Sequence, residues 1–280
     1  MAINTINLAS KMTGALDKAV VQKAVTGFFA DNALRAKFVG AATVLVPSME
    51  FSGLGSYDRD EGFTRGAITV TNESYTLSMD RARSFQLDAQ DCDEIGVTGL
   101  AGQVMGEFVS TQVVPELDAY CLSKLATLAS DKSQTVTGTP ASQAYEMFTQ
   151  AVSDAQSAVG YDEELVAFVD SGMWTAFQTT EELSRQITVS DFAKGGMNTR
   201  VKSINDVAIL PVSDSRMKSK YTFYDGVTSE QTAGGFAPAA GAKSIGLLVL
   251  PRRAASLVKK TETVRIFDPE RKHHPDAWKF

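Results

Sequence analysis

The segment from Tyr75 to Asp88, YTLSMDRARSFQLD, is the feature that most constrains the fold. Its odd-numbered residues are mainly apolar and its even-numbered residues mainly polar, which is the period of two expected of a half-buried β-strand. At roughly 3.3 Å per residue such a strand would span about 45 Å, more than a compact domain of this size usually needs. Arg81 and Arg83 interrupt the apolar side. We therefore expect the strand to find its partner surface outside its own domain.

The residues before this segment predict a long β-hairpin. Ala41 to Pro47, AATVLVP, is a short apolar strand pattern, and residues 48–66 are rich in Gly, Ser and charge, as in an exposed loop. The alternating pattern then runs from Ala67 to Asp88. A two-stranded ribbon is barely stable alone in water, because nothing covers its face. Such a hairpin must lie on another surface, and a neighbouring molecule would explain its length.

The rest of the chain predicts helices and buried strands. Residues 14–39 form an amphipathic helix pattern, which Gly27 weakens. About 35 residues of helix follow a cap at Asp91 or Asp93, and Pro115 is expected to kink this helix or divide it in two. A polar linker at 130–142 precedes an α/β succession. Its expected elements are a helix at 145–159, a strand at 165–169, a second helix, and strands at 207–212 and 245–250. Asp170 or Ser171 is expected to cap the second helix.

Composition and charge exclude several classes of protein. The net charge is −6, but residues 1–40 carry +3 and residues 250–280 carry +4, which leaves −13 for the part between them. Such an acidic body argues against sequence-specific nucleic-acid binding, whereas the basic ends could lie against acidic surface of a neighbouring copy. No apolar run is long enough for a membrane helix, and the N-terminus lacks the pattern of a signal peptide. Cys92 and Cys121 suggest neither a disulfide framework nor a metal site.

No motif predicts a catalytic, cofactor-binding or metal site. GLGSYD at 53–58 has only two of the glycines of a phosphate loop and no following lysine, so we interpret it as a flexible tip. The only two histidines are adjacent, His273 and His274, and a solvated pair needs no metal. The chain has two acidic clusters, Asp58, Asp60 and Glu61 at the hairpin tip and Asp88, Asp91, Asp93 and Glu94 before the long helix. We interpret the first as a solvated tip and the second as helix capping, in preference to calcium binding or acid–base catalysis.

Two stretches and the C-terminal end of the chain resemble one known family. They are GLGSYDRDEGFTRGAITVTNESYTLSMDRARSFQLDAQD at 53–91, MGEFVSTQVVPELDAYCLSKLA at 105–126, and the final DPERKHHPDAWKF. They are similar to the hairpin, spine helix and ending of the major capsid proteins of tailed bacteriophages (Caudoviricetes), which have the Hong Kong 97 capsid fold. The order of the expected elements also resembles that fold over nearly the whole chain, although the sequence similarity is weak in the inserted domain.

The resemblance implies an α+β fold and a structural, non-enzymatic role in the virion. The chain would self-assemble in the host bacterial cytoplasm into pentamers and hexamers of an icosahedral head shell around packaged double-stranded DNA. Its implied partners are copies of itself, a separate scaffolding protein, a portal protein and a cement protein. The implied parts are an N-terminal arm (1–42), an extended hairpin loop (43–87), a peripheral domain with the spine helix (88–130 and 246–280) and an inserted α/β axial domain (131–245).

In this interpretation the hairpin would lie over the peripheral domain of the adjacent subunit. Burial would supply the affinity, while arginines would set the register. Some family members join subunits covalently through a hairpin lysine, but no lysine occurs between Lys37 and Lys124, so we expect a non-covalent shell. The candidate residues for contact between subunits are Arg59, Arg65, Tyr75, Leu77, Met79, Arg81, Arg83, Phe85 and Leu87.

The sequence is also compatible with two alternative functions. An encapsulin, a bacterial compartment with the same fold, would enclose cargo enzymes in place of DNA. A carboxylate-dependent enzyme would act through Asp58, Asp60 and Glu61 and would be a small soluble oligomer.

Overall fold

The computed structural model is a mixed α and β protein, which confirms the predicted class at that level. The chain divides into two compact units, which we call the body (Met1–Asn32 with Phe85–Phe280) and the hairpin unit (Ala33–Ser84). The structure describes residues 19–20, 22–35, 37–39, 42–57, 59, 63, 65–88, 100–137, 140–181, 185, 187–194, 197–259 and 277–279.

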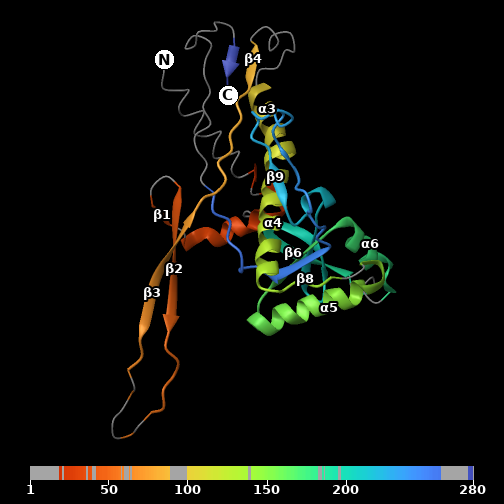
Figure 1. Ribbon diagram of the computed structural model, residues 1–280. Coiled ribbons are helices and arrows are strands. Elements are labelled where there is room, and N and C mark those ends of the chain that lie inside the picture. Colours follow the sequence, from red (N-terminus) through yellow and green to blue (C-terminus); the bar gives the residue numbers. More distant parts are fainter. Residues whose placement is uncertain are drawn as a thin grey trace. The chain divides into compact units, whose positions relative to one another are not determined.

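The hairpin unit is built on a three-stranded antiparallel sheet in the order β1-β2-β3. Its strands are β1 (Lys37–Val39), β2 (Thr43–Phe51) and β3 (Ile68–Thr76). The two longer strands pair along their full length, and they form the extended ribbon in Figure 1. The predicted hairpin is thus present, and β2 runs four residues beyond the expected end at Pro47.

The body is built on a five-stranded sheet in the order β11-β5-β8-β7-β6. β5 and β8 are parallel, and the other neighbours are antiparallel. The strands are β5 (Leu165–Val169), β6 (Ile187–Lys194), β7 (Met197–Ile204), β8 (Val207–Pro211) and β11 (Leu247–Pro251). The helices α5 (Pro140–Val159) and α6 (Ser171–Thr179) lie next to this sheet (Figure 1).

The strand β5 is buried on both faces, as its uninterrupted apolar sequence LVAFV predicts. Leu165, Ala167 and Val169 pack with Phe148 of α5 and Phe177 of α6. The alternate residues of β5 belong to a second cluster on the opposite face, whose members include Phe28, Phe29, Leu122, Val166, Phe168 and Phe192. The sheet is therefore the middle of three layers, with the N-terminal segment and the long helix on its second face.

The longest helix runs without a break from Leu100 to Asp131. It consists of α3 (Leu100–Phe108), a π-helical turn η2 (Val109–Val113) and α4 (Val114–Asp131), and Figure 1 shows it as one rod. Pro115 neither ends the helix nor divides it. Its ring would clash with the carbonyl of Thr111 in a regular α-helix, so the wider π turn just before it accommodates the ring. The hydroxyls of Ser110 and Thr111 donate hydrogen bonds to helix carbonyls in this turn.

The N-terminal segment differs from the single helix predicted over 14–39. The described part is α-helical at 19–20 and 22–23, bends at Ala24, continues as the 3₁₀ helix η1 (Val25–Arg35) and ends in β1. The burial pattern is as predicted, because Val20, Ala24 and Phe28 are all buried. The helix type is not, since the amides of Val25 and Thr26 bond to a side chain from a distant part of the chain, described below.

The predicted single strand over 75–88 is wrong. β3 ends at Thr76, residues 77–85 have no regular secondary structure, and a separate short strand β4 (Gln86–Asp88) follows. β4 pairs with β12 (Ala277–Lys279), so these residues have a ladder of their own inside the body. Alternation survives only partly, with Leu77 and Met79 half-buried and the residues next to them exposed.

The predicted domain boundary at 245/246 would place β5 and β11 in different domains, although these two strands are neighbours in one sheet. β11 pairs with β5 along all five residues, from Leu247↔Val169 to Pro251↔Leu165. α4 also packs on this sheet through Leu122 and Leu125. The remaining elements of the body are a short 3₁₀ turn and a two-stranded ribbon, η3 (Asp214–Arg216), β9 (Tyr221–Phe223) and β10 (Phe236–Pro238).

Candidate functional site

The register of the hairpin decides which of its side chains share a face. Residues directly opposite each other in an antiparallel pair project on the same side, and neighbours along a strand project on opposite sides. The ladder pairs Met49 with Val70 and Phe51 with Ile68, so these four apolar side chains lie on one face. The other face of the same stretch is polar, with the pairs Ser48↔Thr71 and Glu50↔Thr69.

The four apolar side chains, which we call the hairpin apolar face, are exposed. Their exposed fractions are 56% for Met49, 69% for Phe51, 68% for Ile68 and 58% for Val70. Fully burying a side chain of this size stabilises a contact by about 1.5–3 kcal/mol. The ribbon is thus polar on one face and apolar on the other, and exposed apolar patches are typical of surfaces that contact another surface.

The tip of the hairpin extends the apolar character beyond the strands. Leu54, Tyr57 and Phe63 are highly exposed, and the rings of Tyr57 and Phe63 lie 5.1 Å apart. Below the tip, the Ser52 hydroxyl accepts from the Ala67 amide at 2.7 Å and donates to its carbonyl at 3.1 Å, which closes the ladder.

The residues predicted for contact between subunits are only partly brought together. The four arginines, Arg59, Arg65, Arg81 and Arg83, are exposed. Tyr75 is 55% exposed, and its hydroxyl donates to Glu73, a bond that holds the proton and raises the pKa of the tyrosine. Leu77 and Met79 are half-buried, and the ring of Phe85 packs against that of Phe108 at 4.9 Å. Leu87 lies in β4 opposite Trp278. Their role in contact with another molecule stays a prediction.

The hairpin apolar face was missed by the sequence analysis. The signal was present in Met49 and Phe51, which continue the alternation of Leu45 and Pro47, and in Ile68 and Val70. Recognising it required the register of the hairpin, which the loop between the strands does not reveal.

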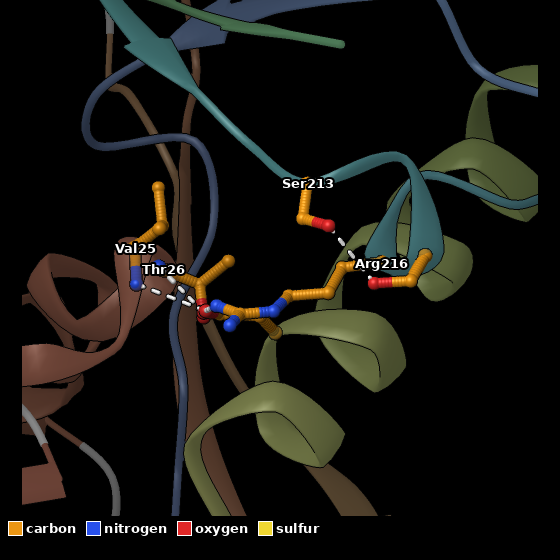
Figure 2. A network of polar contacts seen from close by, with 6 residues as sticks. Val25, Thr26, Ser213 and Arg216 are labelled. Atoms are coloured by element: carbon orange, nitrogen blue, oxygen red, sulfur yellow. Dashed lines mark hydrogen bonds and ion pairs between the residues drawn. The ribbon is translucent and has the colours of Figure 1, made fainter. Parts of the chain in front are cut away.

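A buried polar junction in the body is the second notable arrangement. The carboxylate of Asp118 on α4 is fully buried and accepts from four donors. Oδ1 accepts from the Thr26 amide at 2.9 Å and the Thr26 hydroxyl at 2.7 Å. Oδ2 accepts from the Val25 amide and from Nη1 of Arg216 in η3, both at 3.1 Å. Figure 2 shows the Arg216 side chain reaching toward Val25 and Thr26. We call this set the Asp118 junction.

Cys121 lies one helical turn beyond Asp118 and is also buried. Burial raises the pKa of its thiol to about 12, so it stays protonated at neutral pH. A buried protonated thiol is a poor nucleophile and a poor metal ligand. Cys121 is therefore part of the packing around the Asp118 junction.

Two further carboxylates lie after the parallel strands β5 and β8, where α/β sheets often bind ligands. Asp170, one of the two caps that the sequence predicted for α6, accepts a hydrogen bond from the Met173 amide at 2.7 Å. Asp214 accepts from the amide and the hydroxyl of Ser171. Burial raises the pKa of Asp170, whereas the hydrogen bonds from Ser171 lower that of Asp214. Both carboxylates thus accept hydrogen bonds from the first turn of α6.

Asp170→Ala is expected to lower the free energy of unfolding by about 1 kcal/mol, because it removes the N-cap of α6. The effect is measured by urea denaturation. The control is Asp162→Ala in the exposed loop before β5, which should change stability by less than about 0.5 kcal/mol. Equal effects of the two changes would contradict the capping role.

Among the described residues, no group of three or more His, Cys, Asp and Glu side chains is placed to hold a metal ion. The predicted tip carboxylates Asp58, Asp60 and Glu61 lie outside the described residues, as do Asp91, Asp93, Glu94 and the histidine pair. No described helix is long and apolar enough to cross a membrane. No family model, no curated protein and no solved structure matches this chain.

Proposed function

We propose that this chain is the major capsid protein of a tailed bacteriophage, with the Hong Kong 97 type of fold. It forms pentamers and hexamers of an icosahedral head shell around double-stranded DNA, and it does so without covalent links between subunits. The resemblance of residues 53–91, 105–126 and 268–280 to that family is the origin of the proposal. The implied partners are further copies of the chain, a separate scaffolding protein, a portal protein and a cement protein.

The observation that carries the proposal is the exposed hairpin apolar face. Met49, Phe51, Ile68 and Val70 lie exposed on one face of the hairpin. In a shell, this face would be buried against the adjacent subunit. Obligate assemblies commonly bury upwards of about 2,000 Å², and apolar burial dominates their stability. A contact between different surfaces of identical copies closes into rings, which are the capsomers of such a shell.

Four other features are consistent with the same proposal. In this proposal the helix from Leu100 to Asp131 would be the spine helix, and the five-stranded sheet with α5 and α6 would form most of the α/β domain. The negative charge of residues 41–249 suits a lining along which packaged DNA slides. The absence of lysine between Lys37 and Lys124 removes the hairpin donor of a covalent link.

The experiment is to purify the full chain, alone and with the neighbouring gene products of its source, and to examine it by sedimentation velocity and electron microscopy. The expected result is capsomers or closed shells, which sediment far faster than a 30.1 kDa chain. A particle that contains DNA supports the viral function, while one that contains a cargo enzyme would indicate an encapsulin. A chain that stays monomeric at all concentrations and in all co-expressions would refute both.

A further inference from the structure

We propose that the outer edge of β3 is a second interaction surface, which binds the same edge of β3 in another copy of the chain. The two strands pair antiparallel about a two-fold axis, so that two three-stranded sheets become one sheet of six strands. This contact uses backbone groups at the edge of the ribbon. It is therefore distinct from the hairpin apolar face, and it does not depend on the proposed function.

The ladder between β2 and β3 decides which backbone groups point outward. The Ser52 amide donates to the Ala67 carbonyl and the Leu77 amide donates to the Ala42 carbonyl, and both pairs continue the register of the ladder. In an antiparallel ladder, such hydrogen-bonded pairs alternate with pairs whose N–H and C=O groups point away from the partner strand. The outward groups of β3 therefore belong to its even-numbered residues, which are Ile68, Val70, Asn72, Ser74 and Thr76.

The two long strands of the ribbon differ in the protection of their outer edges. On β2, β1 covers Thr43 to Leu45, and the next outward residue, Pro47, has no N–H group. β1 is short and begins with Lys37, and both features commonly protect an open edge. β3 has no proline, lysine or bulge, its nine residues are all exposed, and no described strand pairs with its outer edge. Such an edge is a template for another strand.

The sequence of β3, ITVTNESYT, is complementary to itself in one antiparallel register. The register centred on Asn72 pairs all nine residues, and its outward groups form about ten hydrogen bonds. It places the two Asn72 amides side by side, where each can donate and accept, and it places Thr69 opposite Tyr75. A shift of the register in one direction sets Glu73 against Glu73 of the second copy. A shift in the other direction leaves Tyr75 and Thr76 without partners.

The pairing closes after two copies. It uses both open edges, and the edges that remain are the protected ones of β2 and β1. The two-fold axis is perpendicular to the new sheet, because residues opposite each other in an antiparallel pair project on the same side. Both hairpin apolar faces therefore lie on one side of the sheet, and the edge contact leaves them free to bind another surface.

Cysteine cross-linking of the purified full chain tests this register. Opposite residues of a hydrogen-bonded pair have Cα atoms about 5.5 Å apart, which a disulfide can span. We expect Asn72→Cys to form a disulfide-linked dimer under mild oxidation in a Cys92→Ser background, in which the buried Cys121 remains. The matched control is Thr71→Cys, which is also exposed. Its two copies lie diagonally, about 7–8 Å apart, so we expect at least about tenfold less dimer.

A mixture of Val70→Cys chains and Ser74→Cys chains tests the register a second time. Val70 lies opposite Ser74 of the second copy in the proposed pair, so the mixture should cross-link, whereas each variant alone should not. Cross-linking of Val70→Cys alone would require another register and would overturn the inference.

Ser74→Pro measures the affinity of the pair. It removes an outward N–H group in both copies and leaves the ladder with β2 intact, so the dissociation constant of the dimer should rise by about tenfold or more, relative to Ser74→Ala. Equal cross-linking of Asn72→Cys and Thr71→Cys, or a disulfide between Asn72→Cys and a protein of another mass, would overturn the inference. Dimers without shells would refute only the proposed function, and shells without the Asn72→Cys disulfide would refute only this inference.

Discussion

Val70→Asp is expected to prevent assembly while leaving the isolated chain folded. Val70 is 58% exposed on the hairpin apolar face, so the change costs the free chain no more than the lower strand propensity of aspartate, about 1 kcal/mol. In an assembled shell the same site would bury a carboxylate without a partner and lose the valine contact. Together these cost several kcal/mol at every hairpin, which raises the assembly threshold by more than about a hundredfold.

The matched control is Thr71→Asp, one residue along the same strand. Thr71 lies opposite Ser48 on the polar face, so it suffers the same loss of strand propensity and the same added charge. Sedimentation over a concentration series should show normal assembly for Thr71→Asp and none for Val70→Asp, with similar melting temperatures for the two. Assembly of Val70→Asp at wild-type concentrations would show that this face is not the contact. Loss of assembly in both would assign the effect to charge alone.

The elements that depend on local pattern were the ones predicted well. LVAFV at 165–169 is buried on both faces, and such a strand needs no knowledge of its neighbours to be recognised. The cap at Asp170 and the helices that flank β5 follow from short-range signals in the same way. The described part of the long helix lies where it was predicted, while its predicted cap at Asp91 or Asp93 lies outside the described residues; the π turn that accommodates Pro115 was not predicted.

The errors arose where a distant partner decides the local structure. The alternation from Tyr75 to Asp88 predicted one strand, but β4 pairs with the C-terminal strand β12, so the ribbon ends at Thr76. Residues 14–39 predicted one helix, but Asp118 takes the amides of Val25 and Thr26 out of the helical ladder. Periodicity records which side of a segment is buried, and it does not record which backbone groups a remote side chain will bind.

The apolar face predicted for the hairpin and the apolar face that the structure exposes lie at different residues. A hairpin with an uncovered apolar face was expected, and one is present, but its most exposed apolar pairs are Met49↔Val70 and Phe51↔Ile68. The predicted face at 75–87 includes Leu77 and Phe85, which are half-buried within the chain. A shift of register by one residue moves every side chain to the other face, and the sequence does not fix that register.

Asp118→Asn is expected to lower the free energy of unfolding by about 3–5 kcal/mol, because it breaks a buried ion pair by removing one partner. Asparagine keeps the shape but has one acceptor oxygen, so its amide group would face the donors now bound to Asp118. Arg216 would remain with a quarter of its side chain exposed and without its carboxylate partner. The measurement is urea denaturation of the unassembled chain.

Glu164→Gln is the matched control, since Glu164 is also a carboxylate bound by an arginine. Nη1 of Arg252 lies 2.9 Å from both of its oxygens, but half of the Glu164 side chain is exposed. Water replaces the lost partner at an exposed site, so this change should cost less than about 1 kcal/mol. The same chemical substitution thus has two different expected effects, and burial alone separates them. Equal losses in the two variants would mean that the Asp118 junction is open to water, and Asp118 would then be too weak a restraint to fix the start of η1.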